Sequence, residues 1–383
     1  MKGRVVLIEL QDGQSRAALV VDGVLEDLLI DPQPKDTVPR PGAVYWATVD
    51  RIAPKLGGAF VKLGHREVGY LRFSKELQFK SDILVQVTGC AEPGKAAPIT
   101  QRVLYKSRFV IVTPDTPGIN VSRQIRCDEE RARLTNIALD FLCNNLEKRE
   151  NNRPIGLIVR TEAQGLNAGP LCQDIAWALG RLETAEDHAR RSASGNLAIQ
   201  SSAAEQALSE WDLHDTIVEI SSKTDVWNDF MMYLEHVLKA IAGRSRHADE
   251  ADLFDHYGVW DDVERLCKPR VNLPSGGWMA IEPTSAMILI DINTGGDFSF
   301  ANGVKANLEA AKELPRQLRL RGLGGQITVD MAPMKKGDRK RVEEALKAAL
   351  RRDPIETTIA GWTPLGHLEL QRKRERRPLS ELF

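Results

Sequence analysis

Two apolar segments separated by an amphipathic stretch constrain the fold of this chain more than any other feature. The segments AMILIDI (286–292) and GGQITVDM (324–331) have the length and composition of buried strands, and residues 303–322 between them have a helical pattern. Because strands buried on both sides are continuously apolar, we expect an α/β sheet covered by helices on both faces. A helical crossover of this length usually makes its two strands neighbours.

Polar residues end both of these strands. Asp291 and Asn293 are two residues apart, so their side chains emerge on one face of the first strand, and Asp330 ends the second. If the strands are neighbours, Asp291 and Asp330 converge at one sheet edge. Magnesium suits such a site, since it takes a few carboxylate oxygens and keeps several waters. The spacing alone favours the alternative, in which each aspartate only caps a turn.

The first hundred residues have the pattern of short strands. Residues 1–30 alternate as strands separated by turns, and a proline-rich segment at 31–42 indicates a linker into a new module. From Gly42 to about Thr100, short β segments alternate with glycine turns. This pattern predicts a small antiparallel barrel.

The middle of the chain is mixed in pattern. Residues 107–182 combine strands with a helix near 128–149, which indicates an α+β module. Residues 184–210 are polar and small, and we expect an exposed helix end or connector there. Residues 216–267 alternate a strand with helices.

Composition limits the classes of protein to consider. The 383 residues exceed what one core usually serves, so two to four domains are expected. The formal net charge is −1, so a polyanion would have to be held by local basic patches. Five scattered cysteines without a C-x-x-C pair indicate reduced thiols in a cytoplasmic protein, and no run approaches a membrane span.

The sequence VNLPSGGWMAIEPTSAMILIDINTGGDFSF, followed by NLEAAKELPRQLRLRGLGGQITVDMAPM, resembles the signature of the bacterial ribonuclease E/G family. That family typically reads L-P-S-G-G, D-I-N, G-G-D, N-L-E-A-A and R-Q-L-R-L-R-x-L-G-G, and then a strand that ends in Asp. The resemblance implies an endoribonuclease of RNA processing or decay. It also implies hydrolysis of single-stranded RNA that leaves a 5′-phosphate and a 3′-hydroxyl.

The same resemblance assigns roles in the catalytic site. It gives the metal-binding positions to Asp291 and Asp330 and a supporting amide to Asn293. Mg²⁺ is the expected cofactor, and Mn²⁺ is the substitute that such a site accepts. Arg319 and Arg321 could contact phosphate through the bidentate geometry that arginine favours, or could form a solvated helix end.

Residues 44–73 resemble the S-one-type RNA-binding barrel of this family. Phe60 and Tyr70 fall where that barrel carries exposed aromatic side chains for stacking on bases. In isolation, either ring would more often belong to the core. The basic residues expected to contact RNA beside these rings are Lys62, His65, Arg66, Arg72 and Lys95.

The segment IGLIVRTEAQG resembles the part of the family that lines a pocket for an RNA 5′-monophosphate. The resemblance implies that Arg160 pairs with the phosphate and that Thr161 donates a hydroxyl hydrogen bond. The alternative is a solvated arginine on an edge strand.

The sequence departs from the family pattern in three places. Only Thr294 separates Asn293 from Gly295, where a longer basic stretch is usual, and Pro333 lies near the position of a further Asp. The sequence given also ends without the cysteine motif that binds an interface zinc. We therefore expect no structural zinc, and an oligomer that forms would not be zinc-linked.

By family analogy, we expect a multidomain α/β protein in which a split scaffold precedes the catalytic domain. The expected parts are an RNase H-like scaffold (1–37 and 205–271), an S-one-type OB barrel (38–105), a 5′-sensor domain (106–204) and a DNase I-like catalytic domain (272–383). The alternative function is an RNA-binding regulator of the same fold with little nuclease activity. The shortened loop after Asn293 motivates that alternative, and the retained aspartates argue against it.

Overall fold

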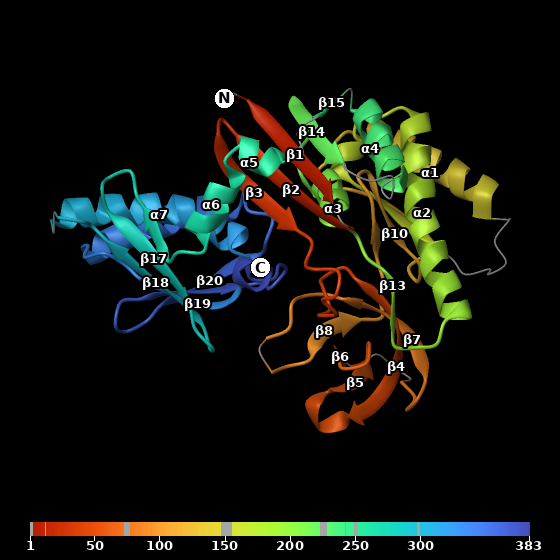
Figure 1. Ribbon diagram of the computed structural model, residues 1–383, viewed down its shortest axis with the longest axis horizontal. Coiled ribbons are helices and arrows are strands. Elements are labelled where there is room, and N and C mark those ends of the chain that lie inside the picture. The colour runs from red at the N-terminus through yellow and green to blue at the C-terminus, as the bar shows by residue number, and fades with distance from the viewer. Residues whose placement is uncertain are drawn as a thin grey trace. The chain divides into compact units, whose positions relative to one another are not determined.

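The computed structural model is a mixed α/β protein (Figure 1). Contacts divide the chain into two compact units: Met1–Val24, Leu29–Thr88 and Lys95–Leu253 form the first, and Leu25–Leu28, Gly89–Gly94 and Phe254–Phe383 form the second. The residues that the structure describes are 3–11, 13–72, 77–92, 94–146, 155–222, 228–241, 243–248, 252–296 and 299–383.

A five-stranded sheet joins the beginning of the chain to a much later segment. β1 (Arg4–Gln11) pairs antiparallel with β2 (Gln14–Val21) and parallel with β14 (Thr216–Ser222). The sheet order is β15-β14-β1-β2-β3, where β3 is Val24–Ile30 and β15 is Arg244–His247. Its core includes residues of α3 (Ala203–Glu210) and α4 (Asn228–Ala240). One sheet therefore contains strands from both parts of the expected scaffold, whose RNase H-like identity stays a prediction.

The predicted small barrel is present and closed. Its strands are β4 (Val44–Ala53), β5 (Gly58–Lys62), β6 (Val68–Arg72), β7 (Asp82–Val87) and β8 (Ala97–Thr100). The ring runs β4-β5-β6-β8-β7 and closes where β7 pairs again with β4, as in an OB-like barrel. Its strand pairs are antiparallel as expected, except that β6 and β8 run parallel. β13 (Asn196–Ile199) pairs with the first residues of β4 beside this ring.

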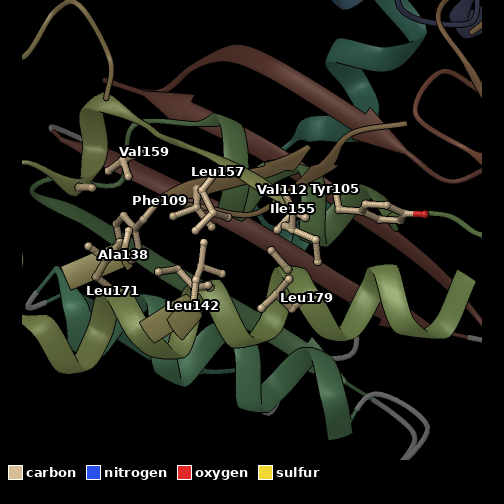
Figure 2. Packing of buried hydrophobic residues seen from close by; sticks show 14 of the residues in the cluster. Tyr105, Phe109, Val112, Ala138, Leu142, Ile155, Leu157, Val159, Leu171 and Leu179 are labelled. Carbon is tan, nitrogen blue, oxygen red and sulfur yellow. The ribbon is translucent and has the colours of Figure 1, made fainter. Parts of the chain in front are cut away.

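The next module packs two helices on a small sheet. The sheet order is β11 (Gly118–Val121), β12 (Gly156–Val159), β10 (Val110–Thr113) and β9 (Tyr105–Lys106). The helices are α1 (Asp128–Leu146), which confirms the helix expected near 128–149, and α2 (Ala168–Arg191). Figure 2 shows Val112 and Leu157 from the sheet facing Leu142 and Leu179 from the helices in one apolar core.

The expectation of an exposed helix end or connector at 184–210 holds for the end of α2 and the connection after it, and is wrong for residues 203–210. α2 continues to Arg191, β13 follows, and α3 is capped by Ser202, whose side chain accepts from the Glu205 backbone N–H. Ala204 and Leu208 of α3 are fully buried. Small residues such as Ala204 suggest exposure because they are weakly hydrophobic, yet they let a helix approach a sheet closely.

The second unit contains a six-stranded sheet, in the order β16-β17-β18-β19-β21-β20. β18 (Ile288–Asn293) and β19 (Gly325–Asp330) are parallel neighbours, as the crossover rule predicts. The other strands are β16 (Arg270–Asn272), β17 (Trp278–Pro283), β20 (Thr357–Trp362) and β21 (Leu368–Arg372). The helices are α5 (Leu253–His256), α6 (Val259–Leu266), α7 (Phe300–Leu320) and α8 (Arg339–Leu350). Short 3-10 turns among the described residues of both units are η1 (Pro54–Leu56), η2 (Thr161–Ala163), η4 (Lys336–Asp338) and η5 (Leu379–Glu381).

The expectation that helices cover both faces of this sheet is wrong. Ile288, Ile290 and Ile292 are buried in a core shared with α7 and α8, and Figure 1 shows α7 running behind β17 and β18. Leu289 between them is 42% exposed, and Asp291 is exposed as well. The exposed Leu289 makes the strand look continuously apolar, although its burial alternates. We call the side that carries Leu289 and Asp291 the open face.

Two further findings concern the whole described chain. Across the residues that the structure describes, no helix is both long and apolar enough to cross a membrane. All five cysteines lie among those residues, and their thiols are free, as their spacing indicates.

Candidate active site

Asp291 and Asp330 lie directly opposite each other in the second unit. The parallel register of β18 and β19 pairs these two residues. Both side chains are exposed, and that of Asp330 is 63% exposed. Neighbouring strands are about 4.8 Å apart, so the two carboxyl groups share one small region of the open face. The convergence predicted from the two strand ends is confirmed.

Two neighbours contact these carboxylates. The Asn293 amide donates from Nδ2 to Asp291 Oδ2 at 2.6 Å, because residues two apart on a strand share a face. On the other side, His367 Nε2 lies 3.7 Å from Asp330 Oδ1. Sequence reasoning missed His367, whose only signal is its place just before the strand LELQR.

Glycines allow the loop before β17 to lie against the end of β18. A Cβ on Gly277 would lie 2.4 Å from the carbonyl oxygen of Asn293. Gly295 has a φ of +78°, and a Cβ there would lie 2.9 Å from the carbonyl oxygen of Gly276. The glycines of L-P-S-G-G and of D-I-N-T-G thus permit a backbone contact beside the carboxylates that other residues would prevent.

Helix α7 holds two loops of the site through two polar side chains, Asn307 and Glu309. Asn307 is fully buried, and its side chain donates to the carbonyl of Ala332 and accepts from the Ala332 N–H, both at 2.9 Å. Glu309 Oε2 accepts from the backbone N–H of Ser275 at 2.9 Å. Asn307 therefore fixes the chain just after Asp330. Sequence reasoning assigned no role to either residue, although polar residues within N-L-E-A-A could have signalled one.

The residues present fit Mg²⁺ better than a metal that needs a complete protein cage. Mg²⁺ is commonly held by one or two carboxylates and keeps several waters. Within the described ranges, no group of three or more His, Cys, Asp or Glu residues is placed to hold a metal. Asp297 of the G-G-D motif lies outside the described residues. Asp291 and Asp330 match the smaller requirement of magnesium.

Both alternatives for Arg319 and Arg321, contact with phosphate and a solvated helix end, are wrong, because both residues are buried. The Arg319 side chain is 7% exposed and forms an ion pair with Asp353, a residue that also pairs with Arg372. Arg321 donates to the carbonyl of Lys268 at 2.7 Å, and burial lowers its pKa to about 10. Both guanidinium groups serve the interior of the second unit.

In the first unit, Phe60 and Tyr70 form a pair on the outside of the barrel. They are opposite each other in the β5–β6 register, and their ring centroids are 5.5 Å apart. Both side chains are half-buried and neither belongs to the core, which excludes the core alternative. A Cβ on Gly58 would lie 2.7 Å from the Tyr70 ring, so the glycine makes room for it. The Arg51 guanidinium lies 4.4 Å from the Phe60 centroid.

The basic residues predicted near these rings are exposed. Lys62 follows Phe60 by two residues on β5 and Arg72 follows Tyr70 by two on β6, so each shares the face of its aromatic neighbour. The loop between β5 and β6 and the segment before β8 carry the others, His65, Arg66 and Lys95.

The residues of the predicted 5′-end pocket lie at the end of β12. Arg160 donates from Nη1 to the carbonyls of Ser107 and Ser209, at 2.7 and 2.8 Å, and its side chain is 21% exposed. The Thr161 hydroxyl lies 2.8 Å from that of Ser122. The guanidinium is thus fixed by backbone on one side, which differs from the solvated arginine of the alternative reading.

Comparison with known proteins covers most of the chain. The model of the Ribonuclease E/G family matches residues 105–375. Ribonuclease G of Haemophilus influenzae is 30% identical over 99% of this chain and 81% of its own length, and Ribonuclease G of Salmonella typhimurium is 27% identical over the same shares. Ribonuclease E of a Nostoc species is 30% identical over 89% of this chain and 52% of its own length. The matched region includes the paired aspartates and Arg160. The chain belongs to the ribonuclease E/G family.

Proposed function

We propose that this endoribonuclease, which acts in RNA processing or decay, hydrolyses single-stranded RNA with Mg²⁺ held by Asp291 and Asp330. One observation carries the proposal: the two carboxylates are paired in register on an exposed face of the sheet. Adjacent carboxylates repel each other unless a cation lies between them. A structural role would not need two such groups in solvent.

The chemistry divides between the cofactor and the side chains. When bound, Mg²⁺ would polarise the phosphodiester and stabilise the charge that develops as it is attacked. The amide of Asn293 holds Oδ2 of Asp291 and adds no charge of its own. His367, beside Asp330, can accept or return a proton. Water attacks phosphorus while the bond to O3′ breaks and O3′ takes a proton. The fragments therefore end in a 5′-phosphate and a 3′-hydroxyl.

The barrel would hold the RNA strand. Phe60 and Tyr70 present adjacent rings outside the barrel core, and a base stacked on such a ring typically contributes ~1–3 kcal/mol. Lys62, Arg72 and Lys95 add positive charge near them. Local charge of this kind is what a chain of nearly zero net charge needs in order to bind a polyanion.

Arg160 and Thr161 would bind a 5′-terminal monophosphate. With Nη1 anchored on two carbonyls, the guanidinium is held in one orientation and can offer other N–H groups to phosphate oxygens. The hydroxyls of Ser122 and Thr161 lie beside each other at this end of β12 and can add hydrogen bonds.

The test is cleavage of a labelled AU-rich oligonucleotide by the purified chain, with Mg²⁺ and with EDTA. We expect cleavage with Mg²⁺, none with EDTA, and products that carry a 5′-phosphate and a 3′-hydroxyl. Binding without cleavage at any Mg²⁺ concentration would favour the RNA-binding regulator. Mn²⁺ should replace Mg²⁺, because it accepts the same oxygen ligands.

A further inference from the structure

A large aromatic residue lies beside the paired carboxylates without belonging to the core. On β17, Met279 and Ile281 are fully buried, so Trp278 and Ala280 emerge on the opposite, open face. The register places Trp278 opposite Asn293 and Ala280 opposite Asp291. The half-buried Trp278 ring therefore starts one strand away from the amide that holds Asp291.

Arg270 covers this ring. Its guanidinium carbon lies 4.8 Å from the Trp278 centroid, within the range of a cation–π contact. The exposed Arg270 side chain is held in place by a hydrogen bond from Nε to Asn272 Oδ1 at 3.0 Å. The result is a stack of a guanidinium group over an indole ring beside Asp291 and Asn293.

A second pair of the same kind shows what packing alone explains. Arg339 lies 4.6 Å from the centroid of Trp362, at the far edge of the same sheet. Trp362 packs against the apolar core of this unit, and its Nε1 donates to Glu343. Trp278 is not among the residues that form or contact that core. The fold accounts for Trp362, whereas Trp278 calls for another explanation.

The chemistry of the stack fits an unpaired nucleobase. Every base has a flat π-face, and both indole rings and arginine planes are surfaces on which RNA-binding proteins stack bases. Diagonal neighbours on paired strands are about 7–8 Å apart, so a base stacked here would lie within one nucleotide of a phosphate held at Asp291. Arg270 would also contribute positive charge next to that phosphate.

We propose that Trp278 and Arg270 form a stacking platform for the nucleobase next to the scissile phosphate of the substrate RNA. The proposal rests on the proposed function and makes Trp278 a substrate-binding residue of the same site. It implies that one position beside the cut requires a base of any identity, because stacking is tolerant of sequence.

The experiment compares the cleavage rates of the wild type and of enzyme variants on RNA substrates that each lack one base. The cleavage site of a short RNA is first mapped with the wild-type chain and Mg²⁺. Single abasic nucleotides are then placed at each position within three of the cut. We expect one position at which the missing base lowers kcat/KM by about 5- to 150-fold, the range that one stacked base gives. Trp278→Ala should lower kcat/KM on the intact RNA by a similar factor. This variant should cleave the intact RNA and the RNA that lacks the base at that position with the same kcat/KM.

The control is Trp362→Ala, which removes the other tryptophan–arginine pair. It should lower the melting temperature and change cleavage of intact and abasic RNA by one common factor. Trp278→Phe should keep most of the wild-type preference, because a ring remains. If Trp278→Ala fails to fold, Trp278→Phe and the abasic scan of the wild type still decide.

The outcomes separate the two proposals. No Mg²⁺-dependent cleavage of intact RNA by the wild type would refute the proposed function itself. Cleavage by a wild type that tolerates every abasic position would overturn the platform alone. A Trp278→Ala variant that loses the same factor on all substrates, or loses nothing, would also overturn it.

Discussion

Asp174 and the pair Asp291–Asp330 show two opposite uses of the same side chain. Asp174 on α2 is fully buried and accepts hydrogen bonds from the N–H groups of Phe109 and Val110, at 2.8 and 3.1 Å, and from the Ser107 hydroxyl. Asp291 and Asp330 are exposed, and among the described residues their polar contacts are with Asn293 and His367. The buried carboxylate organises its own module, whereas the exposed pair keeps oxygens available for a ligand.

The surroundings of Asp174 also determine its proton affinity. Burial raises its pKa to about 6, even though the hydrogen bonds to it and the charge of Arg160 act in the opposite direction. His236 on α4 faces it, with Nε2 3.9 Å from Asp174 Oδ1, and burial lowers the pKa of this imidazole. His236 Nδ1 contacts Gln173 Oε1 at 2.9 Å, so the ring presents its other nitrogen to the carboxyl group. Exposure, more than residue type, therefore separates a structural carboxylate from a candidate ligand.

The sharpest test of this comparison, and the largest expected effect on cleavage, is the loss of either exposed carboxylate. Asp291→Asn or Asp330→Asn should lower kcat by orders of magnitude, because each removes a charge that would hold Mg²⁺. The melting temperature and RNA affinity should stay near wild type, since both side chains are solvent-exposed. Near-normal turnover by either variant would end the metal assignment. Asn293→Ala should cost less, roughly 10- to 100-fold, because it removes an orienting group and not a ligand.

A smaller effect is expected from the exposed rings of the barrel. Tyr70→Ala should weaken binding of single-stranded RNA by roughly 1–3 kcal/mol, with kcat at saturating RNA little changed. Tyr70→Phe is the matched control, because it loses only the hydroxyl that donates to the Leu56 carbonyl and keeps the ring. Filter binding at fixed salt measures both variants. Equal affinity of Tyr70→Ala and wild type would remove this ring from the RNA site.

Arg160 is less buried than Asp174 and less exposed than Asp291 and Asp330. Its substitution therefore tests whether this side chain is structural or binds a ligand. If it binds phosphate, Arg160→Ala should abolish the faster cleavage of RNA with a 5′-monophosphate over RNA with a 5′-hydroxyl or triphosphate. Slow internal cleavage should persist. The variant also leaves the carbonyl groups of Ser107 and Ser209 without the hydrogen bonds that Arg160 donates to them. This loss should lower the free energy of unfolding by about 1–3 kcal/mol. Loss of stability with an equal rate change on all three substrates would leave Arg160 a purely structural residue.

The smallest effect on cleavage should come from the buried carboxylate. The pKa of Asp174 is raised from its ordinary 3.8 to about 6, so between these values the folded chain binds a proton that the unfolded chain does not. Its contribution to stability should therefore fall as the pH rises from about 4 to about 6. Asp174→Asn should remove this part of the pH dependence and leave cleavage near neutral pH unchanged.

Denaturant unfolding at pH 5 and pH 7 measures the effect. Asp140→Asn, at an exposed position on α1, is the control and should retain the wild-type pH dependence. A variant at Asp174 with an unaltered pH profile would show that this carboxyl is ionised in the folded chain throughout the range.

The sequence predicted the features that follow from local pattern and topology. Glycine turns at short intervals indicated the barrel, and the crossover rule made β18 and β19 neighbours, which brought Asp291 and Asp330 together. It could not predict features that depend on distant partners. Arg319 looks like a surface cation until Asp353 is placed beside it, and His367 becomes relevant only because β21 lies next to β19. The sequence also did not show that β18 is buried on one face only, because the exposed Leu289 makes the strand look continuously apolar.

The anchoring of two loops by Asn307 and Glu309 has a consequence for how the site can vary. Side chains of α7 form hydrogen bonds with the backbone of the segment after Asp330 and of the segment before β17. The positions of these two segments therefore do not depend on the length of the connection between Asn293 and α7. Residues could be inserted beyond Gly295, whose contact with Gly276 is kept, while the carboxylates keep their spacing. This helix would make the connection a place where substrate preference can evolve without loss of the chemistry, and where an engineered basic insertion would be tolerated.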